Sequence, residues 1–375
     1  MLATRGIPTT WGASPYKDQV FDDDATVAKR LDAAGAVLCA KLSLGELAMG
    51  DVWFGGLTRN PWQPDQGSSG SSAGPAAATA AGLVAFTIGS ETLGSIISPC
   101  QTCGTTGLRP TYGRVSRHGA MPLARTMDKL GPITRGVEDT ALVLAAIHGA
   151  DGLDPTAAAD VPFRWDPMLD VKTLRVAYEP RAFDFEQDFY KKNPNLRELY
   201  EPAFERLRDL VGELRPIQLP PAEPYTGLAG LVIACESAAS FTELLTSGRV
   251  RELKQQGRGS WPNAFRVGST IPASDYLRAQ QVRTQLQRAM AEAMRDVDAY
   301  VTIPYVGPTV AFTNLTGHPS LVTRAGMLDE RPRSIEFVGN LYREDAICAL
   351  GHAFERATGA PAWPETDKIP PLARG

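Results

Sequence analysis

Two serines in separate loop-like segments have the residue type and setting that nucleophilic chemistry requires. Ser71 lies within Gly67-Ser-Ser-Gly-Ser-Ser-Ala-Gly74, and Ser95 ends Gly89-Ser-Glu-Thr-Leu-Gly-Ser95, 24 positions further along. A serine hydroxyl attacks a carbonyl carbon effectively only when a neighbouring base removes its proton. The 4 histidines are dispersed along the chain, so the sequence offers no evident Ser-His-Asp arrangement for this step.

A lysine amine can replace histidine as the base if burial favours its neutral form. Lys41 follows the apolar run Ala36-Val-Leu-Cys-Ala40, which predicts a short buried strand with Lys41 at its end. The glycines beside Ser71 and Ser95 permit tight turns that aim backbone N–H groups at a developing oxyanion. Taken singly, Lys41 would more often be a solvated lysine, and Ser71 and Ser95 would be ordinary turn residues. The assignment of a catalytic role therefore depends on their joint spacing.

The elements around these residues alternate between helix and strand. Apolar periodicity and Gly or Pro punctuation predict helices at 23–35, 75–81, 137–148, 196–211, 228–245, 276–294 and 343–358. Short apolar runs predict strands at 36–40, 83–88, 174–178, 299–303 and 335–338. This alternation favours an α/β fold in which helices cover both faces of a sheet.

The two serine loops, together with the Ala-rich segment and the strand between them, resemble the amidase signature. That pattern runs as Gly-Ser-Ser-Gly-Gly, an Ala-rich helix, a strand, and Gly-Ser-Asp-Thr-Gly-Gly-Ser-Ile. The matching residues are Gly70-Ser-Ser-Ala-Gly74 through Gly89-Ser-Glu-Thr-Leu-Gly-Ser-Ile96, and only Ser71 has the required separation from Ser95. Further blocks are similar in the same order, at 40–50, 104–116, 127–135, 314–320 and 346–359.

The resemblance implies a role for each residue of a Ser-cisSer-Lys triad. Ser95 is expected to be the nucleophile, Ser71 the bridging hydroxyl and Lys41 the base, because 40–50 resembles the segment of the family's catalytic lysine. The expected oxyanion hole consists of four successive backbone N–H groups, those of Thr92, Leu93, Gly94 and Ser95. The family commonly has glycine where Leu93 stands, so either this side chain points away or the hole changes shape.

The resemblance also implies the architecture, a central mixed β-sheet sandwiched between layers of α-helices. We expect one amidase domain over 1–375, with a signature core at about 36–135 and a substrate-pocket helical region at about 182–295. The Pro- and Asp-rich stretch 151–167 is either a domain boundary or a surface excursion. Members carry a substantial portion before the block that 5–12 resembles, so the chain is expected to be a fragment, to have a mis-assigned start or to be a shortened protein. Missing core elements would expose apolar surface and lead to reduced stability or to homo-oligomer formation.

Composition excludes several classes of partner. The net charge is -4 and no long Lys/Arg block occurs, so the sequence predicts no basic patch that would bind nucleic acid or an anionic membrane surface. No signal peptide or spanning segment is evident, so a cytoplasmic location is the default expectation. The 5 scattered cysteines do not form a disulfide framework, and the CxxC of Cys100 and Cys103 lacks the further ligands of a zinc site. We therefore expect neither a metal nor an organic cofactor.

Three functions stay open at this point. The first is an amidase that hydrolyses a non-peptide, small-molecule carboxamide through an acyl-serine intermediate. The second is the glutaminase-type A subunit of a tRNA-dependent amidotransferase, which requires partner subunits. The third is a catalytically silent shortened homologue that acts as an interaction protein. A fourth interpretation, in which Ser72 is the nucleophile of a GxSxG elbow, requires a preceding strand that the loop-like residues 60–65 do not predict.

Overall fold

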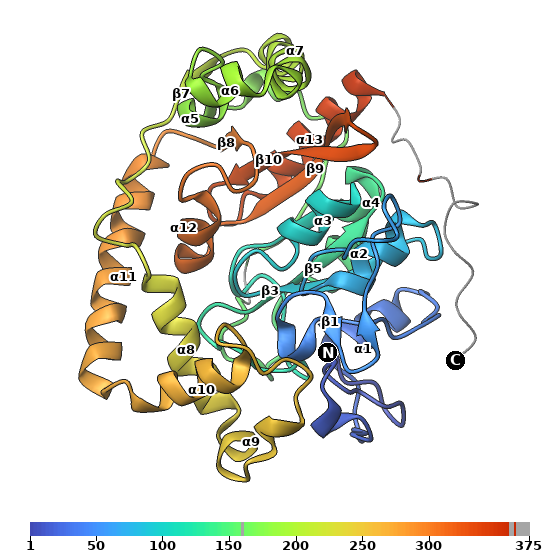
Figure 1. The fold of residues 1–375 in the computed structure, drawn as a ribbon. Helices are drawn as coiled ribbons and strands as arrows, with labels where there is room; N and C mark the ends of the chain where they lie inside the picture. Colours follow the sequence, from blue (N-terminus) through green and yellow to red (C-terminus); the bar gives the residue numbers. More distant parts are fainter. Residues whose placement is uncertain (159–160, 360–363, 365–375) are drawn as a thin grey trace.

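An eight-stranded mixed sheet runs through the computed structural model, which describes residues 1–158, 161–359 and 364. The strand order is β3-β5-β4-β9-β10-β8-β6-β7 (Figure 1). β6 is parallel to both of its neighbours, and the other pairs are antiparallel. The strands are β3 (Thr87–Glu91), β4 (Thr106–Arg109), β5 (Lys129–Thr134), β6 (Val176–Tyr178), β7 (Leu214–Pro216), β8 (Ala299–Thr302), β9 (Ser320–Leu328) and β10 (Arg331–Gly339).

Helices cover both faces of this sheet, which confirms the predicted α/β sandwich. Neighbouring residues of a strand point to opposite faces, and on β9 Leu321 and Val322 belong to different apolar cores. The Leu321 side packs against α4 (Val137–Ile147), α7 (Pro194–Leu210) and α13 (Glu344–Thr358). The Val322 side packs against α2 (Ala73–Ala80) and α3 (Ile97–Cys103). The two serine loops lead into α2 and α3, so both enter on the same face.

A helical lobe lies beside the sheet and has apolar clusters of its own (Figure 1). It contains α8 (Leu228–Ser240), α9 (Thr242–Thr246), α10 (Trp261–Thr270) and α11 (Ala273–Ala293). α11 also packs on α12 (Thr309–Thr316), the helix that follows β8. The predicted pocket region at 182–295 therefore divides: its first part, α5 (Pro180–Phe183), α6 (Asp188–Lys192) and α7, lies at the sheet, and only α8–α11 form the lobe.

The predicted strand at 36–40 is wrong. No residue of 36–40 is in a strand, and the side chains of Val37 and Leu38 are 83% and 60% exposed. A short apolar run forms a strand only when a neighbour completes its backbone hydrogen bonds, and β3, at the edge of the sheet, pairs with β5 instead. The strand predicted at 83–88 also begins later, at Thr87, and the helix predicted at 75–81 begins at Ala73. Lys41 accordingly does not stand at a strand end.

Smaller elements complete the described chain. α1 (Thr26–Ala33) packs on α4, and β1 (Val52–Trp53) pairs with β2 (Gly56–Leu57) in a hairpin between the Lys41 segment and the Ser71 loop. Short 3-10 helices occur at Ser14–Tyr16, Glu46–Ala48, Val171–Thr173 and Arg249–Glu252. The helices predicted at 137–148, 196–211, 276–294 and 343–358 and the strand at 299–303 are confirmed within a few residues.

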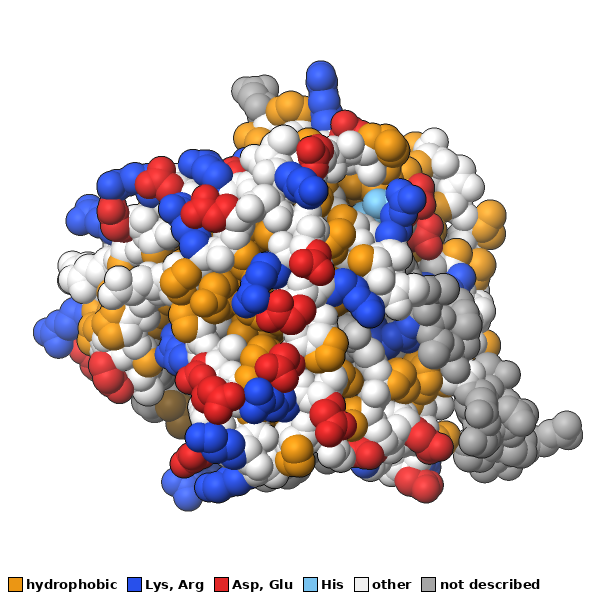
Figure 2. Space-filling view, turned by 90° about the horizontal axis from the view of Figure 1, so that it is seen from above, with side chains coloured by type: hydrophobic (Ala, Val, Ile, Leu, Met, Phe, Trp, Pro, Cys, Tyr) orange, Lys and Arg blue, Asp and Glu red, His pale blue; other side chains and the backbone are white. Residues whose placement is uncertain are grey.

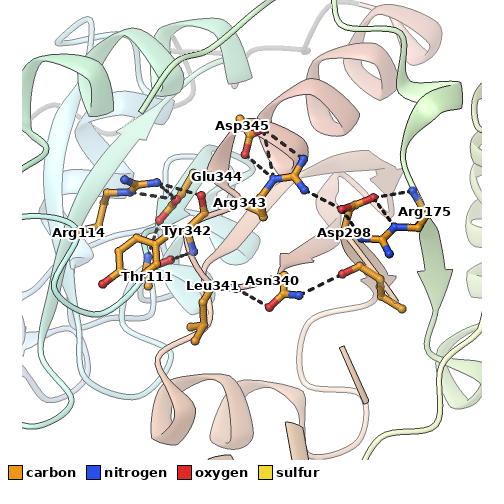
Figure 3. A network of polar contacts seen from close by, with 11 residues as sticks. Thr111, Arg114, Arg175, Asp298, Asn340, Leu341, Tyr342, Arg343, Glu344 and Asp345 are labelled. Carbon is orange, nitrogen blue, oxygen red and sulfur yellow. Dashed lines mark hydrogen bonds and ion pairs between the residues drawn. The ribbon is translucent and has the colours of Figure 1, made fainter. Parts of the chain in front are cut away.

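One buried and two partly exposed ion pairs connect the start of the C-terminal helix to neighbouring segments (Figure 3). Glu344, in the first turn of α13, accepts hydrogen bonds from the Arg114 guanidinium at 2.7 Å and from the Thr111 N–H at 2.8 Å. On the other side, Asp298 accepts from Arg343 at 2.7 Å and from Arg175 at 3.0 Å. Most of these contacts join segments that are far apart in the sequence, so they connect the start of α13 to distant parts of the chain.

Part of the Pro- and Asp-rich stretch packs on the core. Its Phe163 is buried in the same core as α4 and α13, and its Val161 carbonyl accepts a hydrogen bond from Arg114 at 2.6 Å.

Acidic and basic side chains are interspersed on the face shown in Figure 2. Within the described ranges, no helix is both long and apolar enough to cross a membrane.

Candidate active site

The structure brings the two predicted serine loops together through their backbones. The N–H of Ser72 donates to the Ser95 carbonyl at 3.1 Å, so the chain just after Ser71 lies against the chain at Ser95. The Ser71 carbonyl accepts from the N–H of Gly45 at 3.1 Å, which attaches the segment after Lys41 to the same place. The Gly70–Ser71 peptide bond is cis. The spacing of 24 residues thus corresponds to direct contact between the loops.

The hydroxyl groups of these loops have different surroundings. The Ser71 hydroxyl is buried and has no hydrogen-bond partner among the described residues, whereas Ser95 is only half buried. The Ser72 hydroxyl is buried and fully used: it donates to the Ser90 carbonyl at 3.1 Å and accepts from the Ser90 N–H at 3.0 Å. Ser72 therefore fastens the loop to β3, which argues against its role as the nucleophile of a GxSxG elbow.

The backbone between Glu91 and Ile96 offers free donors for an oxyanion. Among the described residues, the N–H groups of Thr92, Leu93, Gly94 and Ser95 donate no hydrogen bond. Gly94 has φ +83°, a conformation that glycine adopts without the steric cost of a Cβ atom. Leu93 is 38% exposed, so its side chain reaches toward solvent and does not fill the space beside the buried Gly94.

Glu91 fixes the geometry of this loop, a role that was not predicted from the sequence. Its Oε2 atom accepts from the N–H groups of Ile96 at 2.8 Å and Ile97 at 3.0 Å, immediately after the predicted nucleophile. Its Oε1 atom accepts from Arg109 at 2.6 Å and from the Asn314 amide at 2.8 Å. Two N–H groups at the start of α3 are thereby satisfied by a carboxylate, and the four preceding ones stay free.

The electrostatics of Glu91 agree with this role. Burial alone would raise its pKa, but the Arg109 cation and the hydrogen bonds outweigh that effect and lower the pKa of Glu91 to about 2. Arg109 is itself fully buried and also donates to the His318 carbonyl at 3.0 Å. Arg109 therefore supports the loop, and Asp128 does likewise, because it accepts from the Thr92 hydroxyl at 2.6 Å. Either support or substrate contact was compatible with their sequence positions.

Lys41 does not have the surroundings that the sequence predicts for it. Its amine donates to the Thr4 hydroxyl at 2.7 Å, to the Leu2 carbonyl at 3.1 Å and to the Thr9 hydroxyl. Burial lowers the pKa of Lys41 to about 8, and the nearby Asp24 opposes this shift. No hydrogen bond joins Lys41 to Ser71 or Ser95 in the described structure. Its role as general base stays a prediction, while its observed contacts anchor the first residues of the chain.

These contacts predict the behaviour of Lys41→Met. The substitution removes three hydrogen bonds, so we expect the free energy of unfolding to fall by about 2 kcal/mol or more. The predicted role as terminal base requires kcat for amide hydrolysis to fall by several orders of magnitude when folded protein is compared. Chemical denaturation and steady-state kinetics measure the two effects. A fall in kcat of less than about tenfold would instead limit Lys41 to anchoring the first residues of the chain.

A cavity of about 240 Å³ opens beside the oxyanion loop. Its lining includes Ser90 of β3 with Thr92 just beyond that strand, Leu130 of β5 with Asp128 just before that strand, and Met1. Ser71, Ser95 and Lys41 are not among its lining residues, so this space touches the candidate site only through Thr92.

The cysteine pair of the sequence has a packing role. Cys100 and Cys103 lie one turn apart on α3, within the apolar cluster of α2, β5 and β9. Burial raises the pKa of the Cys100 thiol to about 12, and it raises the pKa of Cys103 as well. Both thiols therefore stay protonated and inert at neutral pH. No cluster of three or more His, Cys, Asp or Glu side chains suited to a metal ion occurs in the described residues.

Comparison with known proteins places this geometry among enzymes. The family model Amidase matches residues 1–313. The A subunit of glutamyl-tRNA(Gln) amidotransferase from Roseiflexus sp. (strain RS-1) is 33% identical over an alignment of 402 residues. The alignment covers 96% of this chain and 81% of that protein. A solved amidase family protein from Bacillus anthracis str. Ames superposes with a TM-score of 0.84 at 26% identity, over 97% of this chain and 77% of that one. The native peptide amidase from Stenotrophomonas maltophilia superposes with a TM-score of 0.82 at 27% identity, over 98% and 83% of the respective chains.

Proposed function

Because the chain belongs to the amidase family, we propose that it hydrolyses a carboxamide through an acyl intermediate on Ser95. The observation that carries the proposal is the pairing of the two serine loops around free backbone donors. The N–H groups of Thr92 to Ser95 have no partner among the described residues, and the Ser71 hydroxyl is buried beside the same loop without one. Buried polar groups without partners are rare in folded proteins and are typical of sites that bind a ligand.

The proposed reaction has two steps. The Ser95 hydroxyl passes its proton to the Ser71 oxygen as Ser71 passes its own proton to the neutral Lys41 amine. The Ser95 oxygen then attacks the carbonyl carbon, while the free N–H groups stabilise the oxyanion. The C–N bond then breaks, and the nitrogen takes the proton and leaves as ammonia or an amine. Water attacks the acyl-Ser95 ester by the reverse proton path and releases the carboxylate. The terminal base in the sequence-based scheme is Lys41, and this role requires its amine to exchange Thr4 and Thr9 for Ser71.

Ser71→Ala tests the relay. We expect kcat to fall by about three orders of magnitude, because the proton of Ser95 loses its acceptor. The stability should change little, since the Ser71 hydroxyl makes no hydrogen bond among the described residues. Ser72→Ala is the matched control: it loses both bonds to the Ser90 backbone, so it should be destabilised by about 1–2 kcal/mol while the folded enzyme turns over. Equal kcat values for Ser71→Ala and the wild type would exclude the relay.

Two substrate classes are supported by different relatives. Curated proteins at 31–33% identity are named as A subunits of glutamyl-tRNA(Gln) amidotransferase, and they match over 96–97% of this chain. We therefore place glutamine hydrolysis, with transfer of the ammonia in a complex with partner subunits, as the first candidate. A stand-alone amidase for small carboxamides is the second candidate, since a peptide amidase shares the fold over 98% of the chain.

Ammonia release separates these candidates. The purified chain is incubated with glutamine, with simple aliphatic and aromatic carboxamides, and with a C-terminally amidated dipeptide, and Ser95→Ala serves as the blank. Turnover of glutamine that increases when partner subunits co-purify supports the amidotransferase function. Turnover of other carboxamides without any partner supports the stand-alone amidase. Failure of folded protein to hydrolyse any amide or to react with a fluorophosphonate would support the catalytically silent homologue.

A further inference from the structure

Tyr305 lies on the loop between β8 and α12, a connection to which the sequence assigned no function. Its backbone has φ +68°, which is uncommon for a residue with a side chain, and its side chain is 51% exposed. Residues held in such conformations cluster at ligand sites, where the surrounding structure imposes them. The neighbouring carbonyl of Ile303 accepts a hydrogen bond from the Val306 N–H at 3.1 Å, which closes this turn tightly.

The hydroxyl of Tyr305 is placed directly over the oxyanion loop. A Cβ atom at Gly94 would lie 2.4 Å from the Tyr305 hydroxyl oxygen and 3.4 Å from a methyl carbon of Val310 on α12. Both contacts come from the same side of Gly94, the residue before the predicted nucleophile. The β8–α12 connection therefore covers one side of the loop whose N–H groups are free.

A row of hydroxyl groups connects Tyr305 to the serine loops. The Tyr305 hydroxyl interacts with the Ser98 side chain, and this contact partly offsets the burial that raises the pKa of Tyr305 to about 12. The Ser98 hydroxyl in turn lies 2.7 Å from that of Ser69, two residues before Ser71. Tyr305 is thus connected to both serine loops. The hydroxyl is oriented by the loops, and the exposed ring faces the solvent side of the site.

We propose that the Tyr305 ring is a specificity-determining wall of the substrate site and restricts the bulk of the group beside Gly94. This inference rests on the proposed attack by Ser95, because the Tyr305 ring can restrict a substrate only if the substrate binds at the loop that ends at Ser95. The enzyme should therefore accept substrates whose group beside Gly94 is small, such as amides of unbranched aliphatic acyl groups. The ring supplies the restriction, and the tight turn at Tyr305 keeps the ring in place.

The test compares rates of covalent labelling of Ser95 by two fluorophosphonates, which carry a methyl or a phenyl group on phosphorus. Intact-protein mass follows adduct formation in the wild type, Tyr305→Asn and Tyr305→Phe. Asparagine removes the ring and tolerates the positive φ, and phenylalanine keeps the ring. Tyr342→Asn is the matched control, because Tyr342 also has a positive φ, of 62°, but its ring lies over Arg114 and its N–H bonds to Thr111.

We expect the ratio of the phenyl rate to the methyl rate to rise about tenfold or more in Tyr305→Asn. Tyr305→Phe and Tyr342→Asn should keep the wild-type ratio. An unchanged ratio in Tyr305→Asn, with Ser95 still labelled, would overturn the role of Tyr305 and leave the proposed function intact. An equal rise in Tyr305→Phe would show that the ring is not the wall. Absence of any label on folded wild-type protein would overturn the proposed function and this inference together.

Discussion

Ser95→Ala is expected to abolish amide hydrolysis, lowering kcat by about five to six orders of magnitude or below detection. The variant retains every backbone hydrogen bond of the loop but has no hydroxyl oxygen to form the acyl intermediate. Because Ser95 is half buried and its hydroxyl is not part of a hydrogen-bond network in the described structure, the fold should tolerate the change. Ammonia release from the candidate amides and fluorophosphonate labelling measure the effect.

The control for this experiment is Ser98→Ala, which removes a hydroxyl three residues later on the same segment. That hydroxyl contacts Ser69 at 2.7 Å and not the reacting atoms, so labelling of Ser95 should persist within about tenfold of the wild type. A fluorophosphonate adduct on Ser95→Ala, or turnover above about one per cent of the wild-type rate, would contradict Ser95 as the nucleophile. The mass of proteolytic fragments would then locate the reactive residue.

Glu91→Gln is expected to have the second largest effect and to act on both stability and rate. The amide lacks the negative charge that compensates the fully buried Arg109, and loss of one partner of such a pair costs about 3–5 kcal/mol. One of its two terminal atoms also becomes a donor, so it cannot accept from the Ile96 and Ile97 N–H groups and from Arg109 and Asn314 as well. The nucleophile loop should lose its fixed geometry, with kcat reduced at least about a hundredfold.

Glu344→Gln provides a matched control because it breaks the other buried Arg–Glu pair. Arg114 and Glu344 are as deeply buried as Arg109 and Glu91, but they fasten α13 and not the nucleophile loop. Both variants should therefore lower the free energy of unfolding by a similar amount, and only Glu91→Gln should slow the labelling of Ser95. Equal labelling rates for the two folded variants would reduce Glu91 to a purely structural role.

The pKa of Glu91 adds a pH signature to the same comparison. Its folded-state pKa of about 2 lies below the value of about 4.3 expected in the unfolded chain, so its contribution to stability is present above about pH 4.3. That contribution is lost as the pH falls from about 4.3 through about 2. The wild type should therefore lose stability over this range more steeply than Glu91→Gln, and chemical denaturation at several pH values measures the difference.

The long helices were predictable from the sequence because their apolar residues recur on one face. α4, α7, α11 and α13 all lie where periodicity placed them. Two inner strands, β4 and β5, were not predictable in the same way. β4 has four residues and includes Gly107, and β5 contains Pro132, so neither resembles a strand locally. Both become strands through partners elsewhere in the chain: Gly107 lies opposite Val322 on β9.

Sequence spacing was enough to predict which loops of the site meet. It was not enough to predict the partners of side chains such as Glu91 and Lys41, because these depend on how the backbone turns. The separation of Ser71 and Ser95 predicted the contact between their loops, which the Ser72 to Ser95 backbone hydrogen bond realises. The partners of Glu91 could not be predicted from spacing. The turn at Gly94 brings the Ile96 and Ile97 N–H groups back toward the end of β3, where Glu91 accepts their hydrogen bonds. The placement of Lys41 depended on a strand at 36–40, and without that strand its amine reaches Thr4 instead.

The hydrogen bond between Asn314 and Glu91 has a consequence for the order in which the molecule assembles. It spans 223 positions of sequence, and the one from Arg109 to the His318 carbonyl spans 209. Contacts between such distant residues form late, since the loop between them must close first. All residues with predicted catalytic roles are synthesised early, yet the nucleophile loop lacks its Asn314 support until α12 arrives. A nascent chain that ends before α12 should therefore possess the nucleophile without the reactivity.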